Sequence, residues 1–356
     1  MTVNMPIMTH IRRQQGAVRT LIVDDSVVVR TVIERILNNE PAYSVVHKSN
    51  SAELALGYLA DHAVDLVLLD IELPGQSGLA ALPAILKAQA DVKVAILSGK
   101  CEEGSAAAVE ALALGASDIV SKPGSGSFGD QFSQGLIDRL NRLFDQRVMA
   151  VLSTAPVARP ALQPLACLGI GASTGGIHAL GQLFEGLSAP MGVPLLLTQH
   201  LPASFTVYFA QQLMRMTSLR VKVAETGDIL LPDTLYVAPG DANLQVRRGL
   251  HGRVMVQLNP ERTPAGNLPG VDPMFASMAE VYGAGAAGVV LTGMGRDGTV
   301  GARDIVAAGG WIVAQDEASS VVWGMPGSVA GAGLTCALME PHQMMDFVAR
   351  RGRVGA

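Results

Sequence analysis

Short apolar runs alternate with longer amphipathic segments along both halves of the chain. The longer segments repeat apolar residues at helical spacing, as residues 28–37 do. Strands that alternate with helices in this way form parallel sheets. The first half therefore predicts a flavodoxin-like, doubly wound α/β domain with five parallel strands at residues 20–23, 43–47, 65–69, 92–97 and 118–120.

The second half repeats this alternation and predicts another doubly wound α/β domain, with strands at 168–171, 195–199, 235–237, 289–292 and 311–314. Two further runs, 244–246 and 254–257, flank a glycine-containing turn and predict an inserted antiparallel β-hairpin. Prolines and weak periodicity between the halves are typical of a linker. We expect an N-terminal extension at 1–18, a first domain at 19–145, the linker at 146–165 and a second domain at 166–351.

Composition and charge exclude several classes of protein. A length of 356 residues allows two or three domains of about 150 residues each. A content of 49% hydrophobic and 16% charged residues excludes global disorder. No apolar run is long enough to cross a membrane, and the N-terminus lacks the apolar core of a signal peptide, so no membrane insertion is expected. A net charge of −5 without a basic stripe argues against a nucleic-acid partner.

The three cysteines share no metal-ligand spacing along the chain. Cys101, Cys167 and Cys336 lie far apart in the sequence. We expect them to be buried thiols in the reducing environment of the cytoplasm.

Polar residues end four of the five strands predicted in the first half. Asp24 and Asp25 end the first strand, Asp70 the third, Ser98 the fourth and Lys122 the fifth. These carboxyl ends meet at one sheet edge, where three carboxylates would repel one another without a cation, and oxygen ligands suit Mg²⁺. Lys122 and Ser98 could then contact phosphoryl oxygens. The alternative is that each Asp only caps a helix, but this is weakened because all five residues lie at the matching strand ends.

Over residues 19–147 the chain resembles a response-regulator receiver domain, through the motifs L-I-V-D-D-S, L-L-D-I-E-L-P-G, L-S-G and S-K-P. The resemblance implies that Asp70 accepts a phosphoryl group from a chemosensory histidine kinase, and that Asp24 and Asp25 hold Mg²⁺ beside it. It also implies phosphoryl contacts from Ser98 and Lys122. Two positions depart from the family pattern: Ile119 replaces a common aromatic residue, and residues 76–77 replace a common acidic one.

A serine in the second half lies in a sequence typical of a nucleophile turn. Residues 171–175 read G-A-S-T-G, after a predicted strand and before a helical pattern at 177–187, so Ser173 is a candidate nucleophile. A dinucleotide-binding loop is the weaker alternative. Its third glycine position is Thr174, and the next strand ends in His200 instead of an acidic residue.

A catalytic serine needs a base and a carboxylate that orients the base. His200 directly follows the strand predicted beside Ser173, whereas His178 on the next helix is the local alternative. Asp297 lies in the glycine-rich segment 292–298 after another strand. The other candidate acids, Asp316 and Asp272, fit loop or cap positions better. The order Ser173, His200, Asp297 differs from that of α/β-hydrolases, so the motif does not predict that fold.

The region 168–341 resembles the catalytic domain of the chemotaxis protein-glutamate methylesterases. It carries G-A-S-T-G-G, Q-H-L-P-A-S-F-T, L-Y-V-A-P-G, V-L-T-G-M-G-R-D-G and A-Q-D-E-A-S-S-V-V-W-G-M-P. The resemblance implies Ser173 as nucleophile, His200 as base, Asp297 as orienting acid and the Met294 amide as oxyanion donor; we add the Thr174 amide as a second donor. The implied reaction hydrolyses glutamyl methyl esters of chemoreceptors through an acyl-enzyme, with glutamine deamidation as a related activity and no cofactor at this site.

Two further expectations follow from the domain arrangement. The first domain should pack over the serine site until phosphorylation shifts the balance toward an open form. Residues 266–270 replace a common His-Arg-Pro-Ser segment, which raises the prospect of a different substrate choice. The alternative function is a phosphorylation-dependent interaction protein whose hydrolase half is inactive or altered, in a chemosensory pathway that does not govern flagella.

Overall fold

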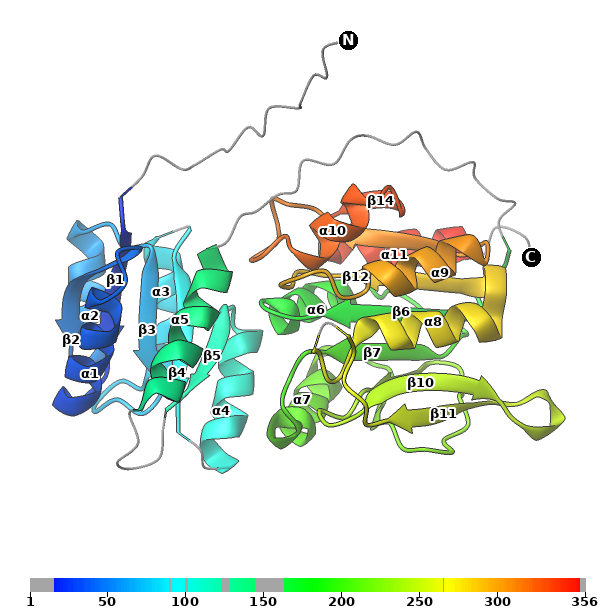
Figure 1. Ribbon diagram of the computed structural model, residues 1–356, viewed down its shortest axis with the longest axis horizontal. Helices are drawn as coiled ribbons and strands as arrows, with labels where there is room; N and C mark the ends of the chain where they lie inside the picture. The colour runs from blue at the N-terminus through cyan, green and yellow to red at the C-terminus, as the bar shows by residue number, and fades with distance from the viewer. Residues whose placement is uncertain are drawn as a thin grey trace, which may run out of the picture.

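Two α/β units lie side by side in the computed structural model (Figure 1). It describes residues 16–89, 91–99, 102–122, 129–144, 163–264 and 266–352. We call residues 16–144 the first domain and residues 163–352 the second domain. Most of the predicted linker at 146–165, and Cys101, lie outside the described residues. The position of the domain boundary therefore stays a prediction.

The first domain is a parallel sheet with helices on both faces. Its strands are β1 (Val18–Val23), β2 (Tyr43–Ser49), β3 (Leu66–Asp70), β4 (Lys93–Ser98) and β5 (Asp118–Ser121), in the order β2-β1-β3-β4-β5. Its helices are α1 (Val27–Asn38), α2 (Ala52–Asp61), α3 (Gly78–Ala88), α4 (Glu102–Ala113) and α5 (Asp130–Phe144). Buried side chains of α1 and α5 pack on one face of the sheet, and those of α2, α3 and α4 pack on the other. This confirms the predicted five-stranded flavodoxin-like fold.

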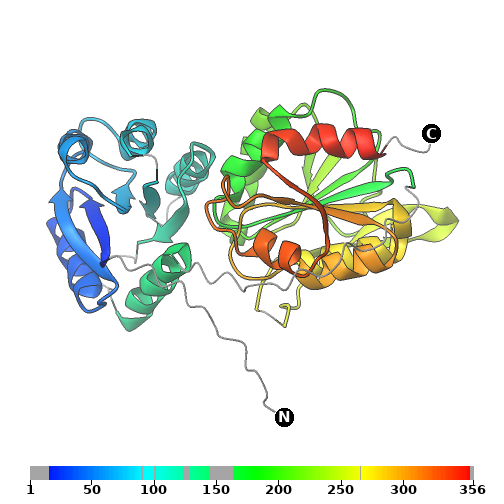
Figure 2. The ribbon, with the colours of Figure 1, turned by 90° about the horizontal axis from the view of Figure 1, so that it is seen from above.

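The second domain is built on a seven-stranded parallel sheet (Figure 2). Its order is β14-β13-β12-β6-β7-β9-β8, with β6 (Cys167–Ala172), β7 (Leu195–Gln199), β8 (Arg220–Val223), β9 (Thr234–Val237), β12 (Ala286–Val290), β13 (Trp311–Gln315) and β14 (Thr335–Met339). Its helices are α6 (Gly176–Glu185), α7 (Ala203–Met216), α8 (Val271–Tyr282), α9 (Thr299–Ala307), α10 (Met325–Gly331) and α11 (Pro341–Gly352). The predicted hairpin is confirmed as β10 (Asn243–Arg248) and β11 (Val254–Asn259).

The structure corrects several details of the sequence interpretation. β8 and β14 were not predicted. Both are short edge strands: β8 alternates basic and apolar residues, and the side chains of β14 are at most partly buried although four of its five residues are apolar. β12 begins at Ala286, not at residue 289. Its first three residues are small because α8 packs close to them: a Cβ on Gly288 would lie 3.0 Å from the ring of Phe275. Small residues there hide the apolar pattern of the strand. Cys167 is buried as expected, but Cys336 is exposed, because it lies on edge strand β14.

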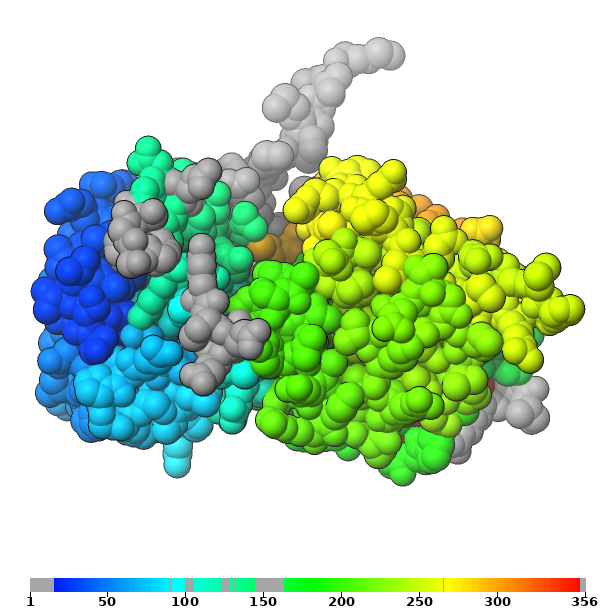
Figure 3. All heavy atoms as spheres, turned by 90° about the horizontal axis from the view of Figure 1, so that it is seen from below, coloured from blue at the N-terminus to red at the C-terminus, as the bar shows by residue number. Residues whose placement is uncertain are grey.

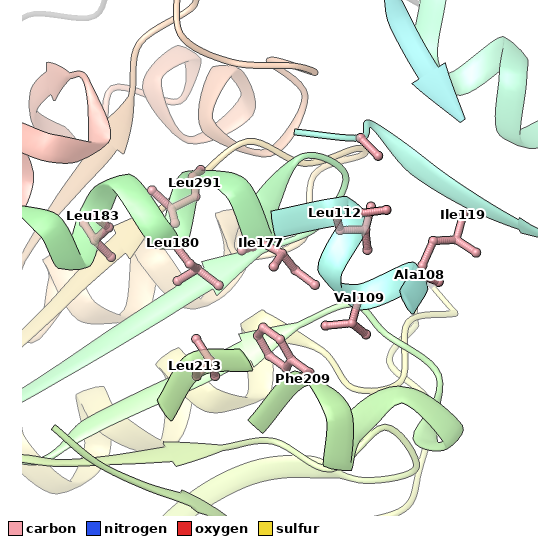
Figure 4. Packing of buried hydrophobic residues seen from close by; sticks show 14 of the residues in the cluster. Ala108, Val109, Leu112, Ile119, Ile177, Leu180, Leu183, Phe209, Leu213 and Leu291 are labelled. Carbon is pink, nitrogen blue, oxygen red and sulfur yellow. The ribbon is translucent and has the colours of Figure 1, made fainter. Parts of the chain in front are cut away.

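Helix α4 of the first domain packs against α6 and α7 of the second (Figures 3 and 4). In Figure 4, Val109 and Leu112 of α4 lie next to Phe209 of α7 and Ile177 of α6, and all four side chains are buried. A continuous apolar core therefore runs across the domain boundary.

Among the residues that the structure describes, no helix combines the length and apolar character that a membrane crossing requires.

Candidate functional sites

Three carboxylates meet at the carboxyl edge of the first sheet. One oxygen each of Asp24, Asp25 and Asp70 lies within 4.8 Å of the others. Lys122, just after β5, places its Nζ 2.8 Å from Asp24 Oδ2 and 2.6 Å from Asp70 Oδ2. Ser98 is buried at the end of β4, and its backbone oxygen accepts a hydrogen bond from Lys122 N at 2.7 Å. The five residues predicted from the strand ends are therefore brought to one edge.

Burial and charge shape the electrostatics of this pocket. Burial raises the pKa of Asp70 to about 6, although the Lys122 ammonium works in the opposite direction. Burial also disfavours the charge of Lys122, but its contacts with Asp24 and Asp70 outweigh this effect and raise its pKa. The side chain that caps α1 is Ser26, whose Oγ accepts from Val29 N. This speaks against the alternative in which Asp24 serves only as that cap.

The residues of this pocket fit a hard divalent cation. All candidate ligands are carboxylate oxygens, the donors that Mg²⁺ prefers. Asp24 Oδ2 is buried, and its partner among the described residues is the ammonium of Lys122, 2.8 Å away. Each carboxylate oxygen has more than one lone pair, so contact with Lys122 still leaves Asp24 able to bind a metal ion, and the residues present fit Mg²⁺.

The candidate nucleophile lies on a tight turn between β6 and α6. Gly175 takes the left-handed conformation, with φ of 74°, that lets the chain reverse from Ser173 into the helix. The Ser173 backbone is held on both sides: its N–H donates to Thr292 O at 3.1 Å, and its carbonyl accepts from Gln199 Nε2 at 2.8 Å. Ser173 retains 9% exposure. The turn that the motif predicts is confirmed, and Gln199 is a supporting residue that sequence reasoning missed.

His200 and Asp297 form a close pair beside this turn. Ala172 and Gln199 are partners in the β6–β7 pairing, so Ser173 and His200 follow neighbouring residues at the sheet edge. His200 Nε2 lies 2.7 Å from Asp297 Oδ2. Because Nε2 is taken by the carboxylate, Nδ1 is the nitrogen left to receive a proton from the serine.

Asp297 is held as a carboxylate by the N-terminus of helix α8. Val271 N–H donates to Oδ2 at 2.7 Å and Asp272 N–H donates to Oδ1 at 3.0 Å. Burial alone would raise the pKa of Asp297, but the hydrogen bond and charge of His200, together with these amides, lower it. The buried acid therefore stays ionised and can orient the imidazole.

The glycine-rich segment after β12 passes directly beside the serine. A Cβ added at Gly293 would lie 2.7 Å from Ser173 Cβ, so only glycine allows this approach. Within the described part of the chain, the backbone N–H groups of Thr174 and Met294 donate to no other protein atom. These two amides are therefore free to stabilise negative charge on an oxygen bound near Ser173.

The alternative residues have other roles. His178 Nδ1 lies 3.0 Å from the carbonyl of Ala113 in the first domain, so its ring serves the domain contact. Asp316 accepts hydrogen bonds from the Ser319 amide and hydroxyl within its own loop. The first two glycines of the dinucleotide-like pattern allow α8 to pack on β6, since a Cβ at Gly169 would lie 2.6 Å from Met278 Sδ. That packing explains them without a bound phosphate.

Comparisons with known proteins agree on both halves of the chain. Residues 168–348 match the CheB methylesterase family, and residues 20–127 match the response regulator receiver domain. A protein-glutamate methylesterase/protein-glutamine glutaminase 2 of Caulobacter vibrioides is 39% identical over 94% of this chain and 99% of its own length. A protein-glutamate methylesterase/protein-glutamine glutaminase of Nocardioides sp. is 40% identical over 94% of this chain and 95% of its own. The crystal structure of the Thermotoga maritima CheB methylesterase catalytic domain is 32% identical, with a TM-score of 0.50, over 52% of this chain and 98% of that one.

Proposed function

The chain belongs to the CheB methylesterase family and carries a response regulator receiver domain, and we propose that it hydrolyses glutamyl methyl esters of chemoreceptors under the control of phosphorylation at Asp70. Deamidation of receptor glutamines is the related reaction at the same site. The observation that carries the proposal is the His200–Asp297 pair, 2.7 Å apart beside the Ser173 turn. The cytoplasmic helices of chemoreceptors are the substrate, so the protein acts in the cytoplasm.

Ester hydrolysis at this site proceeds through an acyl-enzyme. His200 Nδ1 accepts the Ser173 proton as the hydroxyl oxygen attacks the ester carbonyl, and Asp297 stabilises the resulting imidazolium. The amides of Met294 and Thr174 stabilise the oxyanion. The imidazolium then protonates the departing methanol, or ammonia in the case of glutamine. Water, activated by the same histidine, releases the glutamate side chain and regenerates Ser173.

Phosphorylation of the first domain uses the ionised form of Asp70 as the nucleophile. Its carboxylate attacks the phosphohistidine of a chemosensory histidine kinase, and Lys122 pairs with the phosphoryl oxygens. Asp24, Asp25 and Asp70 would hold Mg²⁺, which neutralises charge on the transferring group when bound. Ser98, tied to Lys122 through the backbone, supplies a hydroxyl for a further hydrogen bond.

Methanol release from a methylated receptor fragment tests both parts of this proposal. Wild type should release methanol, and a small phosphodonor should increase the rate. Ser173→Ala should abolish release, whereas Ser188→Ala, an exposed serine, should not change it. Asp70→Asn should retain the basal rate and lose the response to the phosphodonor. Methanol release by Ser173→Ala would contradict the assignment of the nucleophile, and an interaction protein without hydrolase activity would release no methanol in any variant.

A further inference from the structure

Asp297 of the catalytic pair and Asp272 lie at the N-termini of two neighbouring helices, and each accepts hydrogen bonds from the helix of the other. Asp297, just before α9, accepts from the first amides of α8, Val271 N and Asp272 N. Asp272, in the first turn of α8, accepts from Gly301 N in the first turn of α9 at 2.9 Å. A Cβ on Gly301 would lie 2.6 Å from Asp272 O, so glycine is what allows the two helices to approach this closely.

This reciprocal arrangement places Asp272 beside Asp297, since the Asp272 amide donates to Asp297 Oδ1 at 3.0 Å, and the negative charge of Asp297 opposes the ionisation of Asp272. Asp297 holds the larger share of the negative charge, because its oxygens meet three backbone amides and His200. The charged groups that face Asp272 are Asp297 and, beyond Asp297, His200. Helix α9, which packs against Asp272, presents backbone amides to its carboxyl group, and among the described residues no cation forms an ion pair with Asp272. Of the two carboxyl groups, Asp272 is therefore the one that binds a proton more readily.

We propose that Asp272 is a positioning residue of the esterase site, whose ionisation supplies a second negative charge behind the His200–Asp297 pair. This inference rests on the proposed function. When protonated, the Asp272 carboxyl donates a hydrogen bond to Asp297 and draws its charge away from His200. When ionised, it leaves Asp297 to the imidazole and adds its own charge, which stabilises the imidazolium that forms as Ser173 attacks.

The Asp272→Asn variant imitates the protonated state at every pH. Its amide oxygen can still accept from Gly301, and its amide nitrogen can donate to Asp297, but it cannot ionise. Burial raises the pKa of Asp272 to about 6, so the wild type should gain an additional step in kcat near this pH. We expect kcat of the variant to fall by about tenfold at pH 8 with KM unchanged, and to approach the wild-type value below pH 5.5.

The experiment measures methanol release by Asp272→Asn and by the wild type from pH 5 to 9. The ratio of the two rates is compared across pH, because titration of groups in the first domain affects both proteins equally and cancels. Asp304→Asn, an exposed carboxylate on α9, is the matched control and should give a ratio near one throughout. A ratio for Asp272→Asn that does not change with pH would overturn the proposal. Activity in Ser173→Ala would instead overturn the proposed function, so the two failures are distinguishable.

Thermal unfolding provides a readout that does not depend on esterase activity. Ionisation of Asp272 costs the folded state stability as the pH rises from about 4 to about 6, since the folded pKa lies above the unfolded one. Asp272→Asn should therefore raise the unfolding midpoint at pH 8 and leave it unchanged at pH 4. A lower midpoint at pH 8 would show that the side chain serves only packing, and would also overturn the proposal.

Discussion

The backbone carbonyl of Ser117 in the first domain accepts a hydrogen bond from the backbone amide of Gly175 in the second, at 3.2 Å. Gly175 is the N-cap of α6 and lies two residues after Ser173. The His178 ring contacts the Ala113 carbonyl of the same first-domain segment at 3.0 Å. The α4–β5 segment thus holds the beginning of the helix that supports the proposed nucleophile.

The first domain also contacts the loops on the other side of the serine. Lys93 Nζ donates to Val321 O at 3.2 Å, and the side chains of Met294 and Val321 pack on the hydrophobic cluster that joins the α5 side of the first domain to Val322 of the second. Met294 supplies one proposed oxyanion donor, and the Val322 carbonyl accepts from Gly293 N at 3.0 Å. The Gly175 turn and the loop that carries Val321 therefore both contact the first domain. Coverage of the serine site by this domain, and its opening on phosphorylation, stay predictions.

Val109→Asp should raise the basal esterase rate. Val109 is 1% exposed and lies next to Phe209 of the second domain (Figure 4), so an aspartate there would place an unpaired carboxylate in the apolar contact between the domains. The penalty disfavours the docked arrangement, and we expect methanol release without phosphodonor to rise by about tenfold or more. Leu54→Asp introduces the same charge at an exposed position of α2 and should leave the rate unchanged. An unchanged rate in Val109→Asp, with the protein still folded, would argue that docking does not limit activity.

Asp297→Asn should lower kcat by about 10³–10⁴-fold with little change in KM, because a neutral amide no longer fixes the tautomer of His200 or stabilises its positive charge. Asp316→Asn is the informative comparison, since Asp316 was the other loop candidate for this role and its carboxylate accepts from the Ser319 amide and hydroxyl within its own loop. Its effect on kcat should stay within a few-fold. A large loss in Asp316→Asn alone would reverse the assignment of the acid.

The positions of both sites could be predicted from the sequence for one physical reason. β3, β6 and β7 are buried along their whole length, so each begins with an uninterrupted apolar run, and the polar residues Asp70, Ser173 and His200 lie at or just after the strand ends. In a parallel sheet these ends meet at one edge. Asp70, Ser173 and His200 were therefore accessible from strand ends alone, and Asp297 from the glycine-rich segment that follows a strand.

Features that depend on packing between distant segments could not be predicted in this way. The link between Asp272 and Asp297 requires α8 and α9 to pack closely through Gly301, and the sequence pattern indicated only a cap or loop residue. The contact from Ser117 to Gly175 uses backbone atoms, so no side-chain type signals it. Neither periodicity nor motif spacing contains such information, because both describe neighbours along the chain.

Gly293→Ala should impair the esterase site more than it impairs folding. The added methyl group would lie 2.7 Å from Ser173 Cβ and 2.5 Å from Met325 Sδ, so either the serine or the loop that carries the Met294 amide must move. Loss of one oxyanion donor lowers kcat by about 10²–10³-fold. Gly57→Ala adds the same methyl group in open space within α2 and should leave kcat unchanged. Methanol release at the wild-type rate by Gly293→Ala would contradict the proposed position of the oxyanion hole.

Magnesium should stabilise the first domain through Asp24. The Asp24 side chain is fully buried, and one oxygen each of Asp24, Asp25 and Asp70 lies within 4.8 Å of the others, so the three carboxylates can reach the same ion. A cation bound only by the folded state adds about 2.7 kcal/mol at a concentration of 100 times its Kd, so the unfolding midpoint of the wild type should rise with MgCl₂ and return when a chelator is added. Asp24→Asn should lose this rise, because it removes one buried ligand charge, whereas Asp61→Asn, at the exposed end of α2, should retain it. An equal rise in Asp24→Asn would show that magnesium stabilises the protein at another site.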